Sequence, residues 1–238
     1  MPTLNDLKIK LYADGADIAS MLKLYQLPYI QGFTTNPTLM NKAGITDYEA
    51  FARQVLEAIP DRSVSFEVFS DEFDDMARQA RRIAEWGEHV YVKIPVTNTK
   101  GQSATPLIRE LTDAGVKLNV TAVFTLEQTE AIAKALQNGA PAILSIFAGR
   151  IADAGIDPVP LMADALKIIQ PMPNIELLWA SPREVFNVVQ ANDIGCHIIT
   201  ATPDILGKLK SLGKDLTEFS LDTVKMFYND ATAAGFKL

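Results

Sequence analysis

Hydrophobic residues along this chain follow two alternating patterns. Short apolar runs rich in β-branched residues, typical of buried strands, alternate with longer segments in which apolar residues recur every three or four positions, as in amphipathic helices. The predicted strands cover residues 8–13, 29–34, 63–69, 89–96, 116–120, 142–147, 175–180 and 196–200. The predicted helices cover residues 17–24, from 37, 46–59, 71–86, 102–114, 125–138, 158–169, from 182, from 203, and 216–234.

Local signals at several helix starts support this division. Asn36 followed by Pro37 is a favourable N-cap and first helical residue. Capping boxes are predicted over residues 46–49, 125–128 and 181–184, the last with a proline at the first helical position. Residues 149–150 are expected to lie in a loop.

Strands that alternate with helices form parallel βαβ units, and eight units suggest a closed (β/α)8 barrel, a single domain over residues 1–238. The alternative is an open, doubly wound sheet, which usually carries a glycine-rich phosphate turn after its first strand. Residues 14–17, Asp-Gly-Ala-Asp, are not such a turn, so the barrel is favoured. The C-terminal helix, about 216–238, exceeds what barrel closure needs. We expect it to cover a neighbouring subunit, although its apolar face could instead close the barrel bottom.

Lys93 lies within the apolar run of residues 89–96, on the strand face opposite to Val92 and Ile94. A lysine there must extend to solvent, pair with a carboxylate, or stay partly desolvated with a lowered pKa. At the ordinary pKa only roughly one lysine in a few thousand is neutral at pH 7, so an imine-forming lysine needs a lowered pKa. For Lys93 taken alone, a pair with an acid at a strand end is the simpler interpretation.

Polar residues recur at the carboxyl ends of the predicted strands, where the chemistry of (β/α)8 barrels resides. They are Asp14, Thr34, Asn36, Glu67, Lys93, Asn119, Thr121, Ser145, Arg150, Ser181 and Arg183. Because these strand ends meet at one face of a barrel, the side chains are expected to converge at the level of Lys93. Packing alone does not explain the pattern.

Most of these residues also have a purely structural interpretation. They include a turn former (Asp14), an N-cap (Asn36), a buried hydrogen-bonded pair (Asn119 and Thr121), surface charges (Arg150 and Arg183) and, beside them, a core aromatic (Phe147). Glu67 differs, because an ionised carboxylate within an apolar strand needs a partner. Arg183 is expected in the first turn of a helix, where a cation is disfavoured but exposed amides and an arginine make a natural anion site.

Composition narrows the classes of function. The chain has 238 residues with 48% hydrophobic and 21% charged residues, the balance of a globular protein. Its formal charge of −7 argues against non-specific binding to nucleic acid or anionic membranes, so an anionic substrate must meet a local basic cluster.

The single cysteine, Cys196, fits a reducing, cytoplasmic compartment, and neither a signal-peptide core nor a membrane-length apolar run is visible. Two histidines without a Cys/His cluster, and no dinucleotide or P-loop motif, predict that no metal or cofactor is needed.

Several of these motifs resemble the signatures of transaldolases. Residues 34–37 (Thr-Thr-Asn-Pro), 92–95 (Val-Lys-Ile-Pro) and 119–121 (Asn-Val-Thr) are similar to three family signatures, in the same order. Residues 145–150 and 180–183 complete a match that spans about residues 11–200. The chain is similar in size to the compact branch of the family, which also contains fructose-6-phosphate aldolases.

The resemblance implies a class I aldol reaction on a ketose phosphate, without metal or cofactor. Lys93 would form a Schiff base with the donor carbonyl carbon, and Asp14 would move the proton of the donor hydroxyl. Glu67 would act through a water held by Thr121. The implied substrate-binding residues are Thr34, Asn36, Asn119, Ser145 and Phe147 near the dihydroxyacetone unit, and Arg150, Ser181 and Arg183 at the phosphate.

The favoured reaction is transfer of dihydroxyacetone from sedoheptulose 7-phosphate or fructose 6-phosphate to erythrose 4-phosphate or glyceraldehyde 3-phosphate, as in the pentose phosphate pathway. Compact aldolases tend to carry glutamine and tyrosine where this chain has Glu67 and Phe147, so the resemblance favours transfer over release of dihydroxyacetone. Pro182 departs from the family, in which phenylalanine is more frequent, and this leaves a sulfonated or otherwise modified sugar open. The family and the C-terminal helix together imply a homo-oligomer, a pentamer or decamer.

Other interpretations remain. An aldolase would release dihydroxyacetone from fructose 6-phosphate without an acceptor, whereas a barrel that only binds sugar phosphates would carry an unreactive Lys93. An isomerase that uses Glu67 as its base would not need the lysine.

Overall fold

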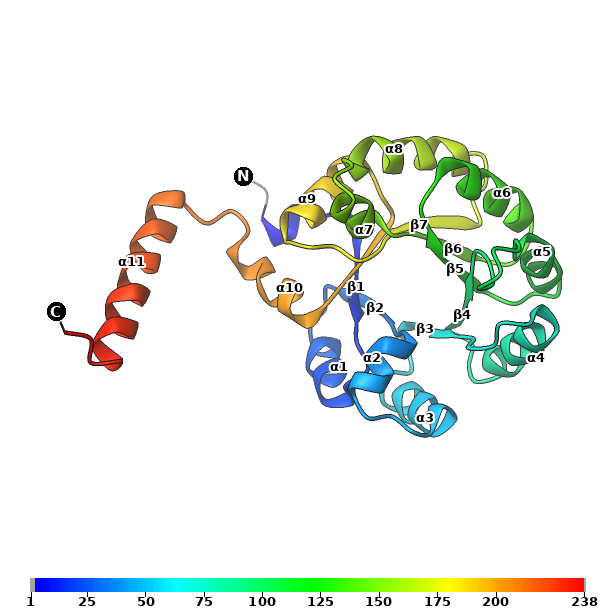
Figure 1. Cartoon of the computed structure of the whole chain (residues 1–238), viewed down its shortest axis with the longest axis horizontal. Helices are drawn as coiled ribbons and strands as arrows, with labels where there is room; N and C mark the ends of the chain where they lie inside the picture. The colour runs from blue at the N-terminus through cyan, green and yellow to red at the C-terminus, as the bar shows by residue number, and fades with distance from the viewer. Residues whose placement is uncertain (1–2, 238) are drawn as a thin grey trace.

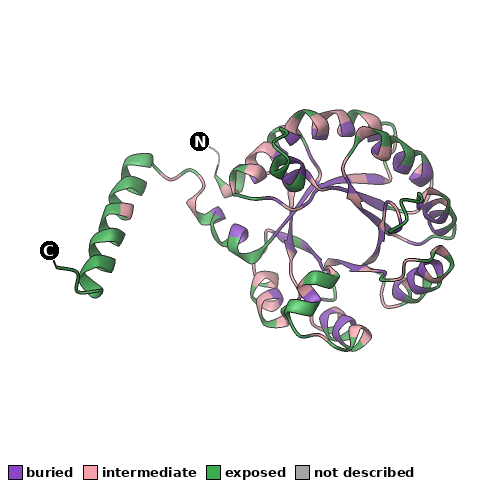
Figure 2. Ribbon diagram, viewed as in Figure 1, coloured by how far each residue is buried: buried purple, intermediate pink, exposed green. Residues whose placement is uncertain are grey.

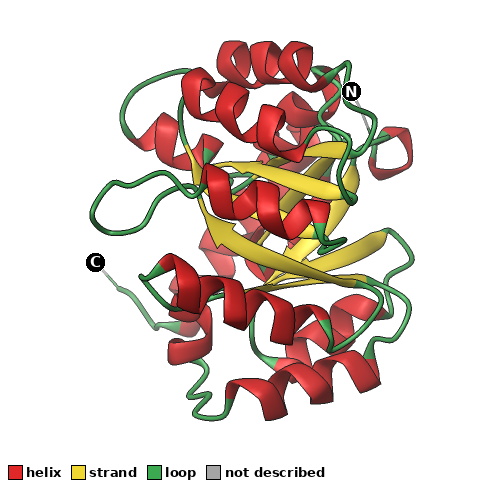
Figure 3. Ribbon diagram, turned by 90° about the vertical axis from the view of Figure 1, so that its right-hand side faces the viewer, coloured by secondary structure: helices red, strands yellow, loops and turns green. Residues whose placement is uncertain are grey.

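Eight parallel strands close into a barrel surrounded by helices (Figure 1, Figure 3). The structure is a computed structural model that describes residues 3–237. The strands are β1 (Lys10–Asp14), β2 (Ile30–Thr34), β3 (Ser63–Glu67), β4 (Val90–Pro95), β5 (Leu118–Val123), β6 (Ala142–Ile146), β7 (Ile175–Trp179) and β8 (Ile198–Ala201). Each strand pairs in parallel with the next, and β8 pairs with β1. The predicted barrel is therefore confirmed, and the open sheet is excluded.

Helices follow the strands, and all except the last, α11, lie around the outside of the barrel. They are α1 (Ile18–Tyr25), α2 (Pro37–Lys42), α3 (Tyr48–Ala58), α4 (Phe73–Ala84), α5 (Thr105–Asp113), α6 (Leu126–Leu136), α7 (Ala148–Asp153), α8 (Pro158–Ile169), α9 (Phe186–Asp193), α10 (Pro203–Gly207) and α11 (Leu216–Ala233), with short 3-10 turns η1 (Leu4–Asp6) and η2 (Leu209–Ser211). Within residues 3–237, no helix combines the length and the apolar character that a bilayer crossing requires.

The two faces of each strand pack against different partners. Outward-facing side chains such as Val92 and Ile94 belong to one continuous core shared with the helices, and the strands are the most uniformly buried part of the barrel (Figure 2). A smaller apolar cluster, which contains Tyr12, Ile143, Leu178 and Ile198, fills the barrel interior. Because side chains alternate along a strand, the residue two positions further on points to the same interior. For Tyr12, Ile143 and Ile198 that residue is polar: Asp14, Ser145 and Thr200.

Helix starts agree with the local signals at two of the four predicted sites. Asn36 caps α2 with Pro37 at its first turn, and Thr125 forms the predicted capping box of α6. At residues 46–49 the prediction is wrong by one position: Asp47, not Thr46, is the N-cap of α3, and its side chain accepts a hydrogen bond from the Ala50 amide. Aspartate is the better capping residue, which explains the shift.

The prediction for residues 181–184 is wrong, because α9 begins only at Phe186. Ser181 adopts a left-handed conformation with φ of 61° instead of capping a helix. The side-chain oxygen of Asn187 accepts hydrogen bonds from the backbone amides of Arg183 and Glu184, at 2.7 and 3.2 Å. Arg183 therefore lies in the loop before the helix, and the argument from a helix N-terminus does not hold.

The loop predicted at residues 149–150 is also wrong, because these residues form part of α7. Two strand ends differ as well. Strand β3 stops at Glu67, since the Gln79 side chain binds the amides of Phe69 and Ser70 and Phe69 is exposed. The strand predicted over residues 116–120 extends further, to Val123.

Helix α11 lies apart from the barrel (Figure 1), and none of its described residues is buried. Its exposed apolar side chains are Leu216, Phe219, Leu221, Val224, Met226, Phe227 and Tyr228. It does not close the barrel bottom, the alternative considered from the sequence.

The barrel interior yields a stability prediction at Gly32. A β-carbon added to Gly32 would lie 2.5–2.8 Å from three ring carbons of Tyr12. Gly32→Ala should therefore destabilise the fold, by about 1–3 kcal/mol as for other overpacked cores. Thermal or denaturant unfolding measures this loss.

A double-mutant cycle identifies its cause. Tyr12→Leu costs stability alone but should remove most of the penalty of Gly32→Ala. Additive effects of the two substitutions would contradict the proposed clash.

Candidate active site

A cavity of about 590 Å³ opens at the carboxyl ends of the strands. It is lined by all the residues that the sequence singled out: Asp14, Thr34, Asn36, Glu67, Lys93, Asn119, Thr121, Ser145, Phe147, Arg150, Ser181 and Arg183. These residues come from strands β1 to β6 and from the segments that follow β2, β6 and β7. The structure thus brings the predicted set together around one space, as expected for a (β/α)8 barrel.

Lys93 is the buried cation of this cavity, with 7% of its surface exposed. Its ammonium nitrogen lies 3.0 Å from Glu67 Oε2 and donates a hydrogen bond of 2.7 Å to the carbonyl oxygen of Thr35. Residues Glu67 and Lys93 are register partners on β3 and β4, so the pairing of the strands sets the ion pair. Of the alternatives drawn from the sequence, the structure shows a lysine that is both buried and paired with an acid.

Asp14 ends β1 at the rim of the interior. The Thr34 hydroxyl donates to Asp14 Oδ1 at 2.8 Å and lies 2.6 Å from the hydroxyl of Thr200. Burial raises the pKa of Asp14, while the Lys93 charge and the Thr34 hydrogen bond oppose the shift. Because burial dominates, protonation of this carboxyl is easier than for an ordinary aspartate.

A hydrogen-bonded chain of neutral side chains spans the interior between β3 and β6. The Ser145 hydroxyl donates to Asn119 Oδ1 at 2.7 Å, and the Asn119 amide donates to the Ser65 hydroxyl at 3.0 Å. All three residues are buried. The contacts fix which side of the Asn119 amide carries its NH2 group, and thereby what it presents to a bound molecule.

Thr121 and Phe147 form the wall of the cavity next to this chain. The β5–β6 register shifts between Val120 and Val123, and Ala122 there has a φ of 59°. This irregularity immediately follows Thr121, a position where a bulge re-aims side chains near a site. The guanidinium of Arg150 stands over the Phe147 ring, 5.3 Å from its centre, a cation–π contact.

Arg183 and Ser181 lie at the outer end of the cavity. Arg183 is paired with Asp153 of α7 and donates from Nη1 to the Ser181 hydroxyl at 3.2 Å. Arg150 and Arg183 together form the local basic cluster that an anionic substrate would need in an acidic chain. Asn36 serves both interpretations, since it caps α2 and also lines the cavity.

Sequence reasoning missed several members of the site. Thr200 and Ser65 are buried and hydrogen-bonded to predicted residues, and Lys42 lines the rim. Thr200 could have been found, because it is a polar residue at the end of a predicted strand like the others. No sequence signal marks the Thr35 carbonyl or Asp153. The first is a backbone group, and the second ends α7, where a loop was predicted at residues 149–150.

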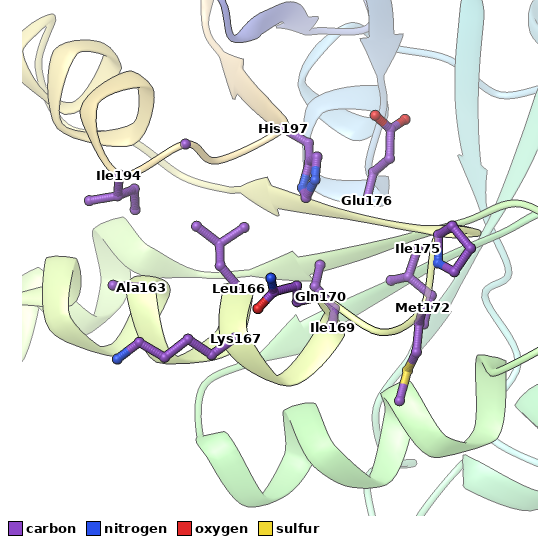
Figure 4. Close-up of a pocket in the computed structure, with 12 residues that line it drawn as sticks. Ala163, Leu166, Lys167, Ile169, Gln170, Met172, Ile175, Glu176, Ile194 and His197 are labelled. Carbon is purple, nitrogen blue, oxygen red and sulfur yellow. The ribbon is translucent and has the colours of Figure 1, made fainter.

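A second cavity, of about 650 Å³, lies at the opposite end of the barrel between α8, β7 and β8 (Figure 4). Its main polar groups already have partners: Glu176 binds Lys10 at 2.6 Å, and Nδ1 of His197 accepts from the Leu177 amide at 3.0 Å. Burial lowers the pKa of His197, consistent with a neutral ring in that contact. Chemistry in (β/α)8 barrels resides at the other face, so this cavity is not the candidate site.

No group of three or more His, Cys, Asp or Glu residues arranged to hold a metal occurs within residues 3–237. The chemistry available is that of a buried amine, two carboxylates, amides, hydroxyls and two guanidinium groups. A buried amine beside a carboxylate suits covalent catalysis on a carbonyl compound.

Comparisons with known proteins show what this chain is similar to. The family described as Transaldolase/Fructose-6-phosphate aldolase matches residues 11–238. A protein named "Probable transaldolase" from Dehalococcoides mccartyi is 34% identical over 199 residues, which cover 83% of this chain and 88% of that protein. Another protein with the same name, from Streptococcus pyogenes, is 35% identical over 202 residues, which cover 84% of this chain and 90% of that protein.

Among solved structures, dihydrodipicolinate synthase from Rhodopseudomonas palustris superposes with a TM-score of 0.55 at 18% identity, covering 90% of this chain and 79% of that one. At that identity the similarity supports the barrel fold and nothing further.

The raised pKa of Asp14 predicts a gain in stability for Asp14→Asn. The folded state holds the Asp14 proton more strongly than the unfolded state, so its stability is greatest below the ordinary aspartate pKa and falls as pH rises through the raised value. At pH 7 the neutral amide should therefore raise the Tm, by about 2–4 °C for each kcal/mol recovered. The gain should shrink at acidic pH.

Asp17→Asn is the matched control. This substitution makes the same chemical change at an exposed N-cap. Hydrogen bonds with Ser20 lower the pKa of Asp17, so no gain in Tm is expected at pH 7. A lower Tm for Asp14→Asn than for the parent chain at pH 7 would contradict the prediction that ionised Asp14 destabilises the fold.

Proposed function

Because this chain belongs to the transaldolase/fructose-6-phosphate aldolase family, we propose that it transfers a dihydroxyacetone unit between sugar phosphates through a Schiff base on Lys93. The donors would be sedoheptulose 7-phosphate or fructose 6-phosphate, and the acceptors erythrose 4-phosphate or glyceraldehyde 3-phosphate. We assign this transfer to cytoplasmic carbohydrate metabolism of the pentose phosphate type. The single observation that carries the proposal is the buried Lys93–Glu67 pair at the base of a cavity with two arginines at its rim.

Imine formation begins with loss of a proton from the Lys93 ammonium. Glu67 lies 3.0 Å away and is the nearest carboxylate to accept it. The neutral amine then attacks the donor carbonyl carbon, and the carbonyl oxygen leaves as water after protonation. Thr121, on the adjacent strand, would hold the water through which Glu67 passes protons in this step and in the final hydrolysis.

Cleavage of the carbon–carbon bond requires a base at the neighbouring hydroxyl. Ionised Asp14 would take that proton, so the hydroxyl carbon becomes the carbonyl of the departing aldose. The bonding electrons move into the protonated imine and leave an enamine on Lys93. Burial raises the pKa of Asp14 and so strengthens this carboxylate as the base that takes the hydroxyl proton. Protonated Asp14 would return the proton when the acceptor aldehyde adds.

Neutral side chains suit the uncharged end of the substrate, and cations suit its anionic end. Asn36, Asn119, Ser145 and Thr34 would bind hydroxyls of the dihydroxyacetone unit. Arg150, Arg183 and Ser181 would bind the phosphate, because guanidinium groups offer paired donors to phosphate oxygens.

The second candidate is an aldolase that releases dihydroxyacetone. Release requires a proton to reach the enamine carbon, and a phenyl ring at Phe147 offers no hydroxyl to donate it or to position a water. Transfer is therefore favoured, since the enamine waits for the acceptor. A modified sugar, for instance a sulfonated one, would use the same arginines, and a binding-only barrel would leave Lys93 unreactive.

Borohydride trapping tests the Schiff base. The protein is incubated with fructose 6-phosphate and borohydride, and peptides are examined by mass spectrometry. We expect a reduced three-carbon adduct on Lys93, and none in Lys93→Met. Failure to form any adduct with the ketose phosphates named above would reject the catalytic proposal.

The same reaction without borohydride separates transfer from release. With fructose 6-phosphate alone, free dihydroxyacetone should stay near background, and product should form once erythrose 4-phosphate is added. Rapid release without an acceptor would establish the aldolase instead. Phe147→Tyr provides an internal comparison, because a hydroxyl at that position should increase the release.

We also propose that the protein is a homo-oligomer, a pentamer or decamer, in which α11 packs on a neighbouring subunit. The support is the apolar surface that α11 exposes, including Phe219, Val224, Phe227 and Tyr228. Contacts of such side chains with water are unfavourable, and burying them against a second copy stabilises the assembly.

Size-exclusion chromatography with light scattering tests this assembly. The parent chain should elute as an oligomer, and Phe227→Lys should shift it toward smaller species. Asn229→Lys, which adds the same charge at a neighbouring polar position, is the control and should leave the mass unchanged. A monomeric parent chain would disprove the proposal.

A further inference from the structure

Beside the outer end of the cavity, an acid that the proposed function does not use binds Arg183. Asp153 is the last residue of α7, and it binds Arg183 side-on. Arg183 Nε lies 2.9 and 3.2 Å from the two carboxylate oxygens, and Nη2 donates to Oδ2. This is a bidentate pair between one helix and the loop before the next.

The pairing determines which donors of Arg183 remain for a ligand. A guanidinium has five N–H groups: one edge pairs Nε with Nη2, a second edge pairs Nη2 with Nη1, and the fifth N–H, on Nη1, belongs to neither edge. Asp153 takes the edge made by Nε and Nη2, and Ser181 accepts from Nη1 at 3.2 Å. One N–H on Nη1 and one on Nη2 lie beyond these contacts. These two N–H groups are the donors that remain for the oxygens of a phosphate.

A close backbone contact holds the same two segments together. A β-carbon on Gly149 would lie only 1.6 Å from the carbonyl oxygen of Ser181, so this approach requires glycine. Ser181 accommodates it with a φ of 61°. Gly149 and Asp153 are four residues apart and therefore lie on one face of α7. The helix thus contacts the loop twice on that face, through backbone at Gly149 and through charge at Asp153.

We propose that Asp153 is a positioning residue for anion recognition: it holds the Arg183 guanidinium so that its remaining N–H groups meet the phosphate of the substrate. The inference rests on the proposed function, because it assigns a task to the phosphate end of that site.

Charge repulsion alone would make Asp153 weaken phosphate binding, whereas positioning of Arg183 strengthens it. A carboxylate beside the site repels a phosphate, so its removal could be expected to tighten binding. However, the Asp153 and Arg183 side chains are about half exposed, at 52% and 45%, and solvent and salt screen such repulsion. An unpaired arginine side chain at the surface instead samples many rotamers, and ordering it opposes binding. Positioning therefore outweighs repulsion.

The test compares phosphorylated and unphosphorylated donors. The ratio of kcat/KM for fructose 6-phosphate to kcat/KM for fructose should fall about tenfold in Asp153→Ala, which corresponds to about 1.4 kcal/mol. The loss should appear in KM for the phosphorylated donor rather than in kcat. Asp153→Asn, which keeps one acceptor oxygen, should give a smaller fall.

Asp164→Ala is the matched control, because it removes another exposed acid, paired with Lys167 at 2.7 Å on α8, and should leave the ratio unchanged. A constant or increased ratio in a folded Asp153→Ala would overturn the inference. If Asp153→Ala does not fold, Asp153→Asn decides by the same criterion.

A binding measurement keeps this inference separate from the catalytic proposal. Calorimetric titration with glycerol 3-phosphate should give a higher Kd for Asp153→Ala than for the parent chain, whether or not Lys93 reacts. Equal affinities would overturn the positioning role. Absence of the borohydride adduct on Lys93 of the parent chain would reject the proposed function alone.

Discussion

The buried charge of Lys93 is the constraint on which the structure at the carboxyl ends of the strands depends. An ammonium group away from water costs several kcal/mol unless it is paired and hydrogen-bonded. Glu67 and the Thr35 carbonyl supply those partners. Because Glu67 and Lys93 are register partners on β3 and β4, a slip of either strand would leave a buried charge unpaired. The pairing that positions the Lys93 amine therefore also specifies the barrel.

The cavity is organised by two different physical means at its two ends. At the inner end, burial and hydrogen bonds fix Asn119, Ser145 and Thr34, so each group has one orientation. At the outer end, Arg183 is half exposed, and burial cannot hold it. A close backbone approach and an ion pair from α7 take over that task. A site that binds a sugar phosphate needs both, because hydroxyl recognition requires precision and phosphate recognition requires accessible charge.

The barrel and the convergence of the site could be predicted from sequence because both follow from short-range periodicity. Strands of period two place Asp14, Glu67, Lys93 and Asn119 at one end of a parallel barrel, whatever the details of packing. Thr200 obeys the same rule and was overlooked only because no motif drew attention to it.

The segment around Ser181 could not be predicted, because its local signals favour a helix start that the tertiary structure overrides. Ser181 followed by Pro182 and Glu184 imitates a capping box. The close packing of Ser181 against Gly149 forces a left-handed backbone there, and the Asn187 side chain captures the amides that a helix would have used. Contacts between residues about thirty positions apart carry no short-range signal. For the same reason, the contact of Asp153 with Arg183 could not be predicted from the sequence.

Phe147 connects the two ends of the cavity and bears on the choice between transfer and release. Phe147 directly follows β6, which carries Ser145 of the inner hydrogen-bonded chain, and its ring lies under the guanidinium of Arg150 at the outer end. The ring is therefore a wall shared by the regions proposed for the dihydroxyacetone unit and for the phosphate. An apolar wall excludes water along the side where an enamine would otherwise be protonated, while the cation above it still attracts the phosphate of the incoming acceptor. In the proposed reaction, exclusion of water and attraction of the acceptor would thus act at one residue, and both would favour transfer.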